Sequence, residues 1–588
     1  MIVPMKKVNI ICQHKDAART VGQLRALGVV HVEHSRLPQG ADIASLQADI
    51  ALAKAAIDVL SRQNSAGASI KSEQALSGDW RTRARHIIDL DKRLDQLNEY
   101  SRALCAKIDE WEPWGDFDPA QIESLARRNI FVRLFRIPVR DLGTLAPDEI
   151  VQTVSVRKGI ADCVIVSRKK KELAYKEIMP PRNSLSAMRS RFEKDAVLAT
   201  ALRQELAQQC VFSKTIQEQK SLLEKELSFQ QAVCGMGQHG MLAYISGYAP
   251  VDSIEALEQA ARVHQWALLS SDPGPDDAVP TLLRNPAWVN RVEPVFNLLG
   301  IIPGYRELDV SPVFLVFFSI FFGILIGDAG YGLAYLALTA WLHCRNRRDS
   351  SMAQVFSLLY VLSLCAVIWG VMTGTFFGQE WLRNRGFRAL VPGLNDVRTM
   401  QTFCFFLGAF HLSLAHAWRA VLKLPSLSAL SDAGWICVLW TAFFLARTLI
   451  LGDPFPPFGP WLAAAGAGMV VLFTNPQRNM LKALAEGFGA VALSLMNNFT
   501  DVVSYVRLFA VGLAGVAIAE TTNSMAAGLG SGPAGIIFGA LIAGIGHSLN
   551  IVLGPMSVLV HGVRLNVLEF SSHANISWSG FAYEPLRE

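Results

Sequence analysis

The sequence predicts a mainly α-helical protein. An antiparallel coiled-coil arm with two small α/β lobes is expected over residues 1–310, and an all-α membrane domain of about eight transmembrane helices, the last two long and tilted, over residues 311–588. Three observations predict this fold class. Apolar residues repeat at heptad-like spacing in the first part, long apolar runs with few charges begin at Ser311, and polar stripes follow the last two runs.

The arm is predicted by three periodic segments. From Ile43 the apolar residues Leu46, Ile50, Ala53, Ile57 and Leu60 fall on one helical stripe. The second segment repeats the pattern with one polar break, through Ile87, Leu90, Leu94, Leu97, Ser101, Leu104, Ile108 and Trp111. The third segment follows "MPPRNS" and has its apolar stripe at Leu185, Phe192, Leu198, Leu202, Leu206, Leu223 and Leu227. The helices before and after the region between the second and third segments are therefore expected to pair antiparallel into a rod. The alternative is that this rod serves only as a structural spacer.

Two small lobes are predicted by short runs rich in β-branched and aromatic residues. "NIFVRLFRIPV" and "ADCVIVSRKK" are expected to be strands of one lobe, because turn residues bound them. "MLAYISGYAP" and the helix "VDSIEALEQAARVH" are expected to form the other. The opening strand "KKVNIICQ" is expected to join one of the two.

Charge and cysteine content exclude several classes of protein. The net charge is only +5 and no tract is dense in Lys or Arg, so no nucleic-acid partner is expected. Nine cysteines are scattered without a C-x-x-C pair, which is typical of a reducing compartment and predicts no metal site. No cofactor is expected. "MIVPMKKVNII" contains no apolar run of signal-peptide length, so the first half is expected to stay in the cytoplasm.

Eight apolar segments are predicted to span the membrane. They lie near 312–326, 329–343, 353–376, 399–419, 434–451, 459–474, 487–528 and 533–571. The glycines of "GDAGYG" permit a tight turn between the first two, and an even count returns the C-terminus to the cytoplasm. Predicted cytoplasmic loops contain Arg345, Arg347, Arg348, Arg419, Lys423, Arg478 and Lys482, as the positive-inside rule requires. Arg383, Arg385, Arg388 and Arg398 oppose this topology from a loop on the other side.

The last two segments have about 40 residues each, so they must tilt, break or protrude. One carries a polar stripe of Asn497, Thr500, Ser504 and Arg507, and the other a stripe of His547, Asn550, Gly554, Ser557, His561 and Arg564. Glu520 falls off the first stripe. Two polar stripes in apolar helices predict a buried interface or a hydrated path between them.

Each of these charges also has a structural alternative. Arg507 could pair with Asp501 or with a backbone carbonyl, and His547 and His561 could join helices by hydrogen bonds. Asp328, between Gly327 and Gly330, could simply cap a turn. Glu569, near the cytoplasmic end, is expected to meet water.

The motifs resemble those of one known family. "SYVRLFAVGLAG" and "GHSLNIVLGPMSVLVHGVRLNVLEF" are similar to segments of the membrane subunit of V-type and A-type rotary ATPases, called subunit I in bacteria and subunit a in eukaryotes. Further matches are "TGTFFG", "FFGILIGDAGYG", "PTLLRNPAWVNRVEPVFNLLGIIPGYRELDVSP" and "ISGYAP", so the resemblance spans nearly the whole chain. The pattern agrees with bacterial members.

The resemblance implies a stator subunit in the cell membrane, with its N-terminal domain and C-terminus cytoplasmic. Its soluble part would be a peripheral arm bound to the stalk subunits and the central-stalk or ring-cap subunit. Its membrane part would form two half-channels for H⁺ or Na⁺ against a rotating proteolipid ring whose subunits each bear a carboxylate. The family's essential arginine falls on Arg507 and its second on Arg564, with half-channel positions at Asn497, His561 and Asp328. Polar support is expected from Thr500, Ser504, His547, Asn550, Ser557 and Glu569.

The chain departs from eukaryotic members at two positions. They carry a histidine where this chain has Gly515 and a glutamate where it has Gly554, which leaves open which group conducts ions on the non-cytoplasmic side. No G-x-x-x-x-G-K-[ST] motif is present, so ATP hydrolysis is expected in partner subunits and this chain is not an enzyme by itself. A secondary ion transporter should show inverted repeats, which the sequence lacks, and a membrane-anchored scaffold would not explain the polar stripes.

Overall fold

The computed structural model describes residues 1–64, 79–144, 150–157, 159–169, 175–347, 352–379, 389–474, 494–530 and 532–587. The chain divides into two compact units. One consists of Met1–Val8, Tyr248–Ala260 and Leu269–Pro585, and the other of Asn9–Gly247, Ala261–Leu268 and Leu586–Glu588. The predicted boundary between residues 310 and 311 stays a prediction. Several loop charges used for the topology lie outside the described residues: Arg348, Arg383, Arg385, Arg388, Arg478 and Lys482.

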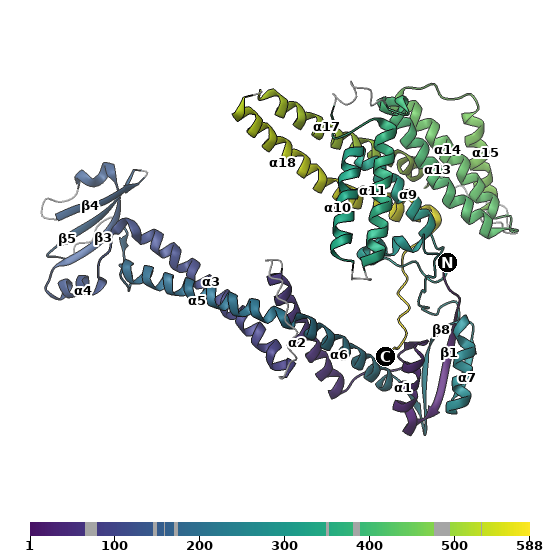
Figure 1. The fold of residues 1–588 in the computed structure, drawn as a ribbon, viewed down its shortest axis with the longest axis horizontal. Helices are drawn as coiled ribbons and strands as arrows, with labels where there is room; N and C mark the ends of the chain where they lie inside the picture. Colours follow the sequence, from purple (N-terminus) through teal and green to yellow (C-terminus); the bar gives the residue numbers. More distant parts are fainter. Residues whose placement is uncertain are drawn as a thin grey trace. The chain divides into compact units, whose positions relative to one another are not determined.

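Long paired helices dominate the second unit. They are α2 (Ala41–Asn64), α3 (Trp80–Trp111), α5 (Leu185–Gln209) and α6 (Ser213–Cys234), with the shorter α1 (Ala17–Leu27) packed on α6. Ile87 near the start of α3 shares a core with Leu206 near the end of α5. Trp111 at the other end of α3 shares a core with Leu185. The two helices therefore run antiparallel, as Figure 1 shows, and the description of the whole arm as a coiled coil stays a prediction.

The third periodic segment is not one continuous helix. A 3₁₀ turn at Cys210–Phe212 separates α5 from α6, which lets α6 pack against α2 while α5 packs against α3. Leu198, predicted on the apolar stripe, is 50% exposed, whereas its neighbour Ala199 is buried. α5 contacts both α3 and α2, and Leu198 lies outside the face that these contacts bury.

Two sheets lie in the N-terminal part of the chain, and the four-stranded one is antiparallel. A four-stranded sheet has the order β4-β5-β3-β6, formed by β3 (Phe131–Pro138), β4 (Ile150–Arg157), β5 (Ile160–Ser167) and β6 (Glu177–Ile178), next to α4 (Pro119–Arg127). β3 pairs with β5 in the register Phe131↔Ser167 to Pro138↔Ile160. The second sheet has the order β2-β8-β1-β9, with β7 on β8. Its strands are β1 (Met5–Gln13), β2 (His31–Glu33), β7 (Gly237–His239), β8 (Leu242–Pro250) and β9 (Ala267–Ser271), and α7 (Ile254–His264) follows β8. The sequence-predicted strands are present, and the opening strand belongs to this second sheet.

Apolar helices make up most of the first unit after the short α8 (Glu293–Leu299). They are α9 (Ser311–Ile326), α10 (Ala329–Arg345), α11 (Ala353–Thr373), α13 (Val397–Lys423), α14 (Ala429–Leu451) and α15 (Gly459–Phe473). Among the described residues, five helices are long and apolar enough to cross a membrane, or six if α9 and α10, bent by 120° at their junction, count as one. The fold is thus mostly helical and membrane-embedded, while the count of eight spans stays a prediction.

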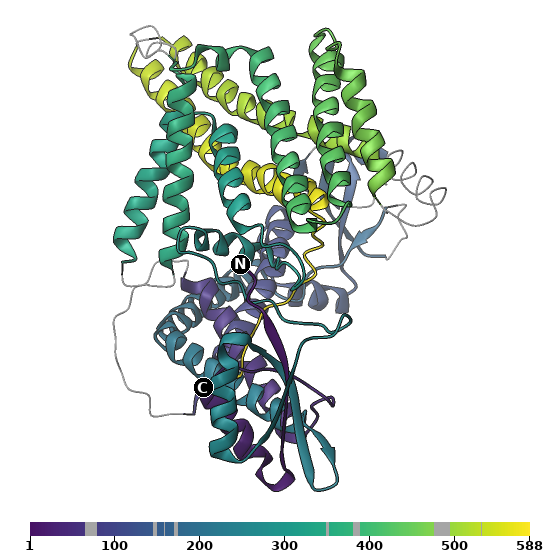
Figure 2. The same ribbon diagram turned by 90° about the vertical axis from the view of Figure 1, so that its right-hand side faces the viewer.

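Each of the last two apolar segments forms one long helix with irregular turns, Ser494–Gly528 and Pro533–Ala574. The helical segment 494–504 is separated by a turn at Tyr505 from α17 (Val506–Gly528). α18 (Pro533–Ser557) continues into the π-helical segments Val558–Gly562 and Leu565–Phe570 and ends in α19 (Ser571–Ala574). Figures 1 and 2 show α17 and α18 side by side.

Candidate functional site

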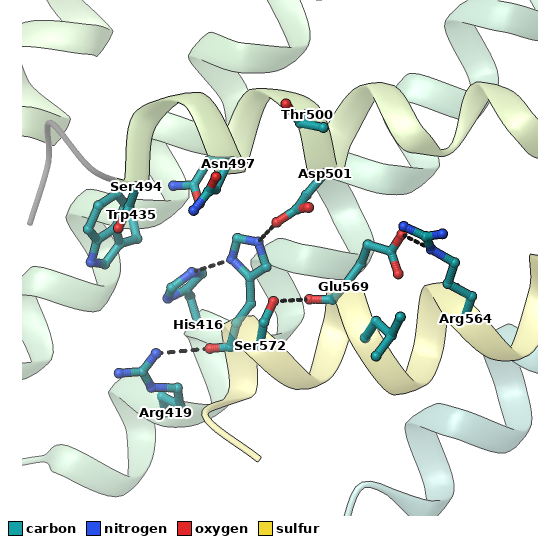
Figure 3. A pocket seen from close by; sticks show the side chains of 13 residues that line it. His416, Arg419, Trp435, Ser494, Asn497, Thr500, Asp501, Arg564, Glu569 and Ser572 are labelled. Atoms are coloured by element: carbon teal, nitrogen blue, oxygen red, sulfur yellow. Dashed lines mark hydrogen bonds and ion pairs between the residues drawn. The ribbon is translucent and has the colours of Figure 1, made fainter. Parts of the chain in front are cut away.

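A polar cavity of about 500 Å³ lies where the first residues of the 494–528 segment face the end of the last helix. In Figure 3 Asp501 and Glu569 reach it from helices on opposite sides. Its full lining is mainly polar: His416, Arg419, Trp435, Ser494, Asn497, Asn498, Thr500, Asp501, Arg564, Leu568, Glu569, Ser572 and His573. The two polar stripes of the sequence therefore meet at this cavity.

A line of hydrogen bonds leads from the cavity wall into the protein. Asp501 Oδ2 lies 3.1 Å from Nε2 of His573, and Nδ1 of His573 lies 2.9 Å from Nε2 of His416. Nδ1 of His416 lies 3.2 Å from Asp432 Oδ1, and Asp432 Oδ2 accepts a 2.6 Å hydrogen bond from Lys423 Nζ. Figure 3 marks two of these hydrogen bonds with dashed lines, the one between Asp501 and His573 and the one between His573 and His416. Four separate elements thus meet through one chain of polar contacts.

Glu569 is buried at the opposite wall. Its side chain is only 5% exposed, and Oε1 accepts a 3.3 Å hydrogen bond from Nε of Arg564, which is itself exposed. Oε2 is buried without a hydrogen-bond partner among the described residues. Glu569 was expected to meet water because it lies near one end of the segment; the structure buries most of the side chain and leaves it in contact with the cavity only.

Arg507 lies two residues after the break at Tyr505. The Tyr505 ring is fully buried, and its hydroxyl lies 2.7 Å from Nδ1 of His411, which anchors the start of α17. Nη1 of Arg507 is buried and has no hydrogen-bond partner in the described part of the chain. Within that part no ion pair joins Arg507 to Asp501, whose carboxylate bonds His573 instead. The alternative of an Arg507–Asp501 pair is therefore not supported.

The other residues of the Arg507 stripe either line the cavity or form hydrogen bonds within their own helix. Asn497 and Thr500 line the cavity, whereas the hydroxyls of Thr500 and Ser504 donate to the carbonyls of Met496 and Asp501. On the other helix, His561 lies near enough to Arg507 and Arg564 for both charges to act on it. The structure thus brings both arginines to the vicinity of His561.

Asp328 lies apart from the cavity and is almost completely buried, at 1% exposed. Its Oδ1 accepts hydrogen bonds from the amides of Gly330, Tyr331 and Phe377 at 2.7, 3.2 and 2.8 Å, and its Oδ2 accepts one from Gly378 at 3.1 Å. The carboxylate therefore caps α10 and ties it to the loop after α11. The alternative of a turn-capping aspartate is confirmed by these contacts, and a role in translocation stays a prediction.

His547 and Asn550, the first two residues of the last stripe, join helices through hydrogen bonds. His547 bonds the Tyr331 hydroxyl at 2.7 Å and Asn523 at 3.0 Å, and Asn550 donates to the Gly515 carbonyl at 2.8 Å. Ser557 is half-buried at the end of α18. The hydrogen-bonding alternative therefore holds for His547.

Tyr335 occupies the space beside Gly554. A Cβ at Gly554 would lie 2.8 Å from the Tyr335 hydroxyl, which donates to the Ile551 carbonyl at 2.9 Å. A carboxylate has no room here unless Tyr335 moves, so the tyrosine hydroxyl is the polar group at this point.

Sequence reasoning missed several polar groups of the site. Asp432, His416 and His573 were not singled out, because they belong to elements far apart in the sequence and share no spacing. The one available signal was the density of ionisable residues in "HAWRAVLK" at the end of an apolar segment. Among the described residues, no group of three or more His, Cys, Asp or Glu is arranged to hold a metal ion.

Comparisons with known proteins cover the full chain. No protein-family model matches it. It is 32% identical over 643 aligned residues to the V-type ATP synthase subunit I 1 of Treponema pallidum (strain Nichols), and 29% identical over 613 to the V-type ATP synthase subunit I of Borreliella burgdorferi. Both alignments cover 100% of each chain. A solved cytoplasmic N-terminal domain of subunit I, a homologue of subunit a of V-ATPase, covers 45% of this chain and 100% of its own at 17% identity, with a TM-score of 0.23, too low to support a structural comparison.

Proposed function

Because the chain belongs to the subunit I family of V-type and A-type ATP synthases, and is thus a membrane subunit of a multi-subunit rotary complex, we propose that it forms the ion path of that complex. In this proposal the helices carrying Arg507 and Arg564 face a rotating ring of carboxylate-bearing subunits. H⁺ or Na⁺ then crosses by two half-channels, and the crossing is coupled to ATP hydrolysis or synthesis in partner subunits.

The observation that carries the proposal is the environment of Arg507. Its guanidinium stands on an apolar helix, with Nη1 lacking a partner among the described residues. A charge on an apolar helix is stabilised by an opposite charge, and because Arg507 is only half-buried, a partner from outside the chain can reach it. The helices around Arg507 leave surface for such a partner. Of the apolar 18-residue stretch in each helix, only 28% is buried within this chain in Ser494–Gly528 and 11% in Pro533–Ala574.

A ring carboxylate suits this position electrostatically. Two unit charges about 4 Å apart at an effective dielectric of about 20 attract by about 4 kcal/mol, which lowers a carboxyl pKa by about three units. The carboxylate therefore ionises when it faces Arg507 and binds its ion again when it turns into lipid. A guanidinium keeps its proton at working pH, so it also blocks direct passage of cations between the half-channels.

The polar cavity is proposed as one half-channel. Asn497 and Asp501 on one wall and Glu569 on the other offer oxygen atoms to a hydrated cation or a proton. Arg564 tunes the charge of this wall through its bond to Glu569. Stalk and ring-cap subunits are proposed to bind the N-terminal arm. We place the cavity, the arm and the C-terminus on the cytoplasmic side, and a cysteine at Glu588 should then resist an impermeant reagent added outside intact cells.

The test compares the two arginines in the assembled complex. Arg507→Lys should reduce ATP-driven ion uptake into membrane vesicles by at least about a hundredfold, because lysine loses the planar fork and can deprotonate in a dry site. Arg564→Lys should reduce uptake less, since its partner Glu569 can still pair with an ammonium. Co-purification of the ring checks assembly in both variants. Near-normal uptake by Arg507→Lys would contradict the proposal.

A further inference from the structure

Two imidazole rings link two carboxylates beside the polar cavity, and each ring uses both nitrogens. The three gaps in this line are Asp501 to His573 at 3.1 Å, His573 to His416 at 2.9 Å, and His416 to Asp432 at 3.2 Å. The side chains of His416, His573 and Asp432 are 5%, 5% and 1% exposed, whereas that of Asp501 is 25% exposed and lines the cavity. Asp501, His573 and His416 all line the cavity, so solvent reaches the line from that side, most of all at Asp501.

The number of hydrogens in the line is fixed by its chemistry. A neutral imidazole carries one N–H and one lone pair, and an ionised carboxylate only accepts. Two neutral histidines between two carboxylates thus supply two hydrogens for three gaps, and one gap must bring two lone pairs together. A third proton, which converts one ring to imidazolium, gives every gap a hydrogen. All three gaps lie within hydrogen-bonding distance, and only the state with three protons gives each of them a hydrogen.

We propose that Asp501, His573, His416 and Asp432 form a proton store that takes one proton from the cavity and returns it there. The inference rests on the proposed function, because it gives the ion as H⁺ and assigns the cavity as its entrance. An imidazole chain passes protons between nitrogens but offers no oxygen cage for Na⁺.

Uptake and return of the proton balance without any other reactant. A hydronium ion in the cavity protonates Asp501, which passes the proton to Nε2 of His573 as that nitrogen holds the lone pair. The proton on Nδ1 of His573 can then move to Nε2 of His416, which transfers the positive charge from the first ring to the second. Return follows the same bonds in reverse and leaves the two rings neutral and both carboxylates ionised.

The surrounding charges differ between the two ends of the line, with two cations at the Asp432 end. Lys423 bonds Asp432 Oδ2 at 2.6 Å, and Arg419 Nε lies 3.5 Å from Oδ1, so two cations hold Asp432 ionised. Arg419 also donates to the His573 carbonyl at 2.9 Å, which fixes the last helical turn. The other ionisable groups that face the store are His411 on α13 and Arg564 and Glu569 across the cavity. Because the cations repel a proton at the inner end, the stored proton stays toward Asp501.

The test measures proton uptake by the assembled complex in membrane vesicles as a function of pH. His573→Gln and His416→Gln keep hydrogen-bonding side chains that cannot titrate. The matched control is His343→Gln on α10, whose ring bonds the Tyr360 hydroxyl at 3.2 Å outside the store. The uptake rate of each variant is divided by the wild-type rate at the same pH. This removes the pH dependence of the ATP-hydrolysing subunits, which are the same in all variants.

We expect each store variant to fall to about a tenth of the wild-type rate near pH 8, where protons are scarce, and to remain within about threefold near pH 6. The control should follow the wild type at both. Asp501→Asn should give the same pH-dependent loss, and the double variant with His573→Gln should lose no more than either single change, because the groups act in series.

Three results would overturn the store. They are unchanged uptake in the histidine variants, a loss by the same factor at every pH, which indicates a purely structural clamp, and ion uptake that requires Na⁺. None of these touches the proposed function, which is tested separately by Arg507→Lys at every pH.

Discussion

Asp328, at the junction of α9 and α10, and Arg507, in α17, are both charges among apolar helices, yet their surroundings are opposite. Four backbone amides from two segments surround the Asp328 carboxylate, which is 1% exposed. Arg507 is half-buried, and its Nη1 has no partner among the residues that the structure describes. The comparison teaches that a buried charge satisfied by its own chain stabilises the fold, whereas one left unsatisfied is available to a partner that comes and goes.

The largest effect expected from this comparison is on stability. Asp328→Asn replaces one acceptor oxygen by an NH₂ group that faces backbone N–H donors, so it should destabilise the membrane part by about 3 to 5 kcal/mol. Thermal denaturation of the purified complex measures this loss. The number of ions moved per ATP should be normal in the complexes that survive.

The matched control is Asp396→Asn. Asp396 caps the exposed start of α13 through the amide of Thr399 at 2.9 Å, so its replacement should have a much smaller effect. If Asp328→Asn assembled normally but lost ion coupling, Asp328 would lie on the ion path and the comparison would break.

A smaller effect is expected from the packing around Asp328. A Cβ added at Gly370 would lie 1.9 Å from the Ala329 backbone nitrogen, so Gly370→Ala must push α11 away from the start of α10. The expected destabilisation is about 1 to 3 kcal/mol in the same denaturation experiment.

Gly468 on α15 provides the control for this change. A Cβ there meets nothing within 4 Å, and Gly468→Ala should be neutral or slightly stabilising, because alanine favours the helix. Equal effects of the two substitutions would show that the Asp328 region is not tightly packed.

The smallest effect concerns an ion pair at the surface of the arm. Arg81 donates to Asp49 through Nε at 2.9 Å and Nη2 at 2.6 Å, and these bonds hold the pKa of Asp49 below its ordinary value. A depressed carboxyl pKa contributes stability above the unfolded value of about 3.9, and this contribution is lost as the pH falls through the lower folded value.

Asp49→Asn should therefore raise amide exchange rates in α2 and α3 of the full complex at neutral pH, by at most about fivefold. The difference from the wild type should shrink as the pH falls below about 4. A difference that persists at low pH would mean that Asp49 acts through packing and not through its charge.

Much of the fold could be predicted because its signals are local. The heptad spacing identified α2 and α3, and runs of β-branched residues identified β3, β5 and β8. The break of the third segment at Cys210–Phe212 escaped prediction, since no proline or glycine marks it. The π-helical segments escaped as well, because "VLVHG" and "LNVLEF" read equally well at 3.6 residues per turn.

The candidate site was predicted only where one helix carries a pattern. The Arg507 stripe was visible because its members recur at helical spacing. The amides that bind Asp328 come partly from Phe377 and Gly378, about fifty residues further on, and no local pattern reports them. The same holds for His416 and His573, which lie 157 residues apart in the sequence and 2.9 Å apart in space.

The most direct test of the central claim asks what lies in front of Arg507. Ala514 is exposed two helical turns further along the same face of α17, so Ala514→Cys is combined with a cysteine placed near the ring carboxylate in the assembled complex. Leu449→Cys on α14, where the native side chain is 66% exposed, serves as the control. We predict an oxidant-dependent cross-link to the ring from Ala514→Cys only, with ion uptake arrested until the bond is reduced. No cross-link from Ala514→Cys, or one from Leu449→Cys instead, would contradict the account.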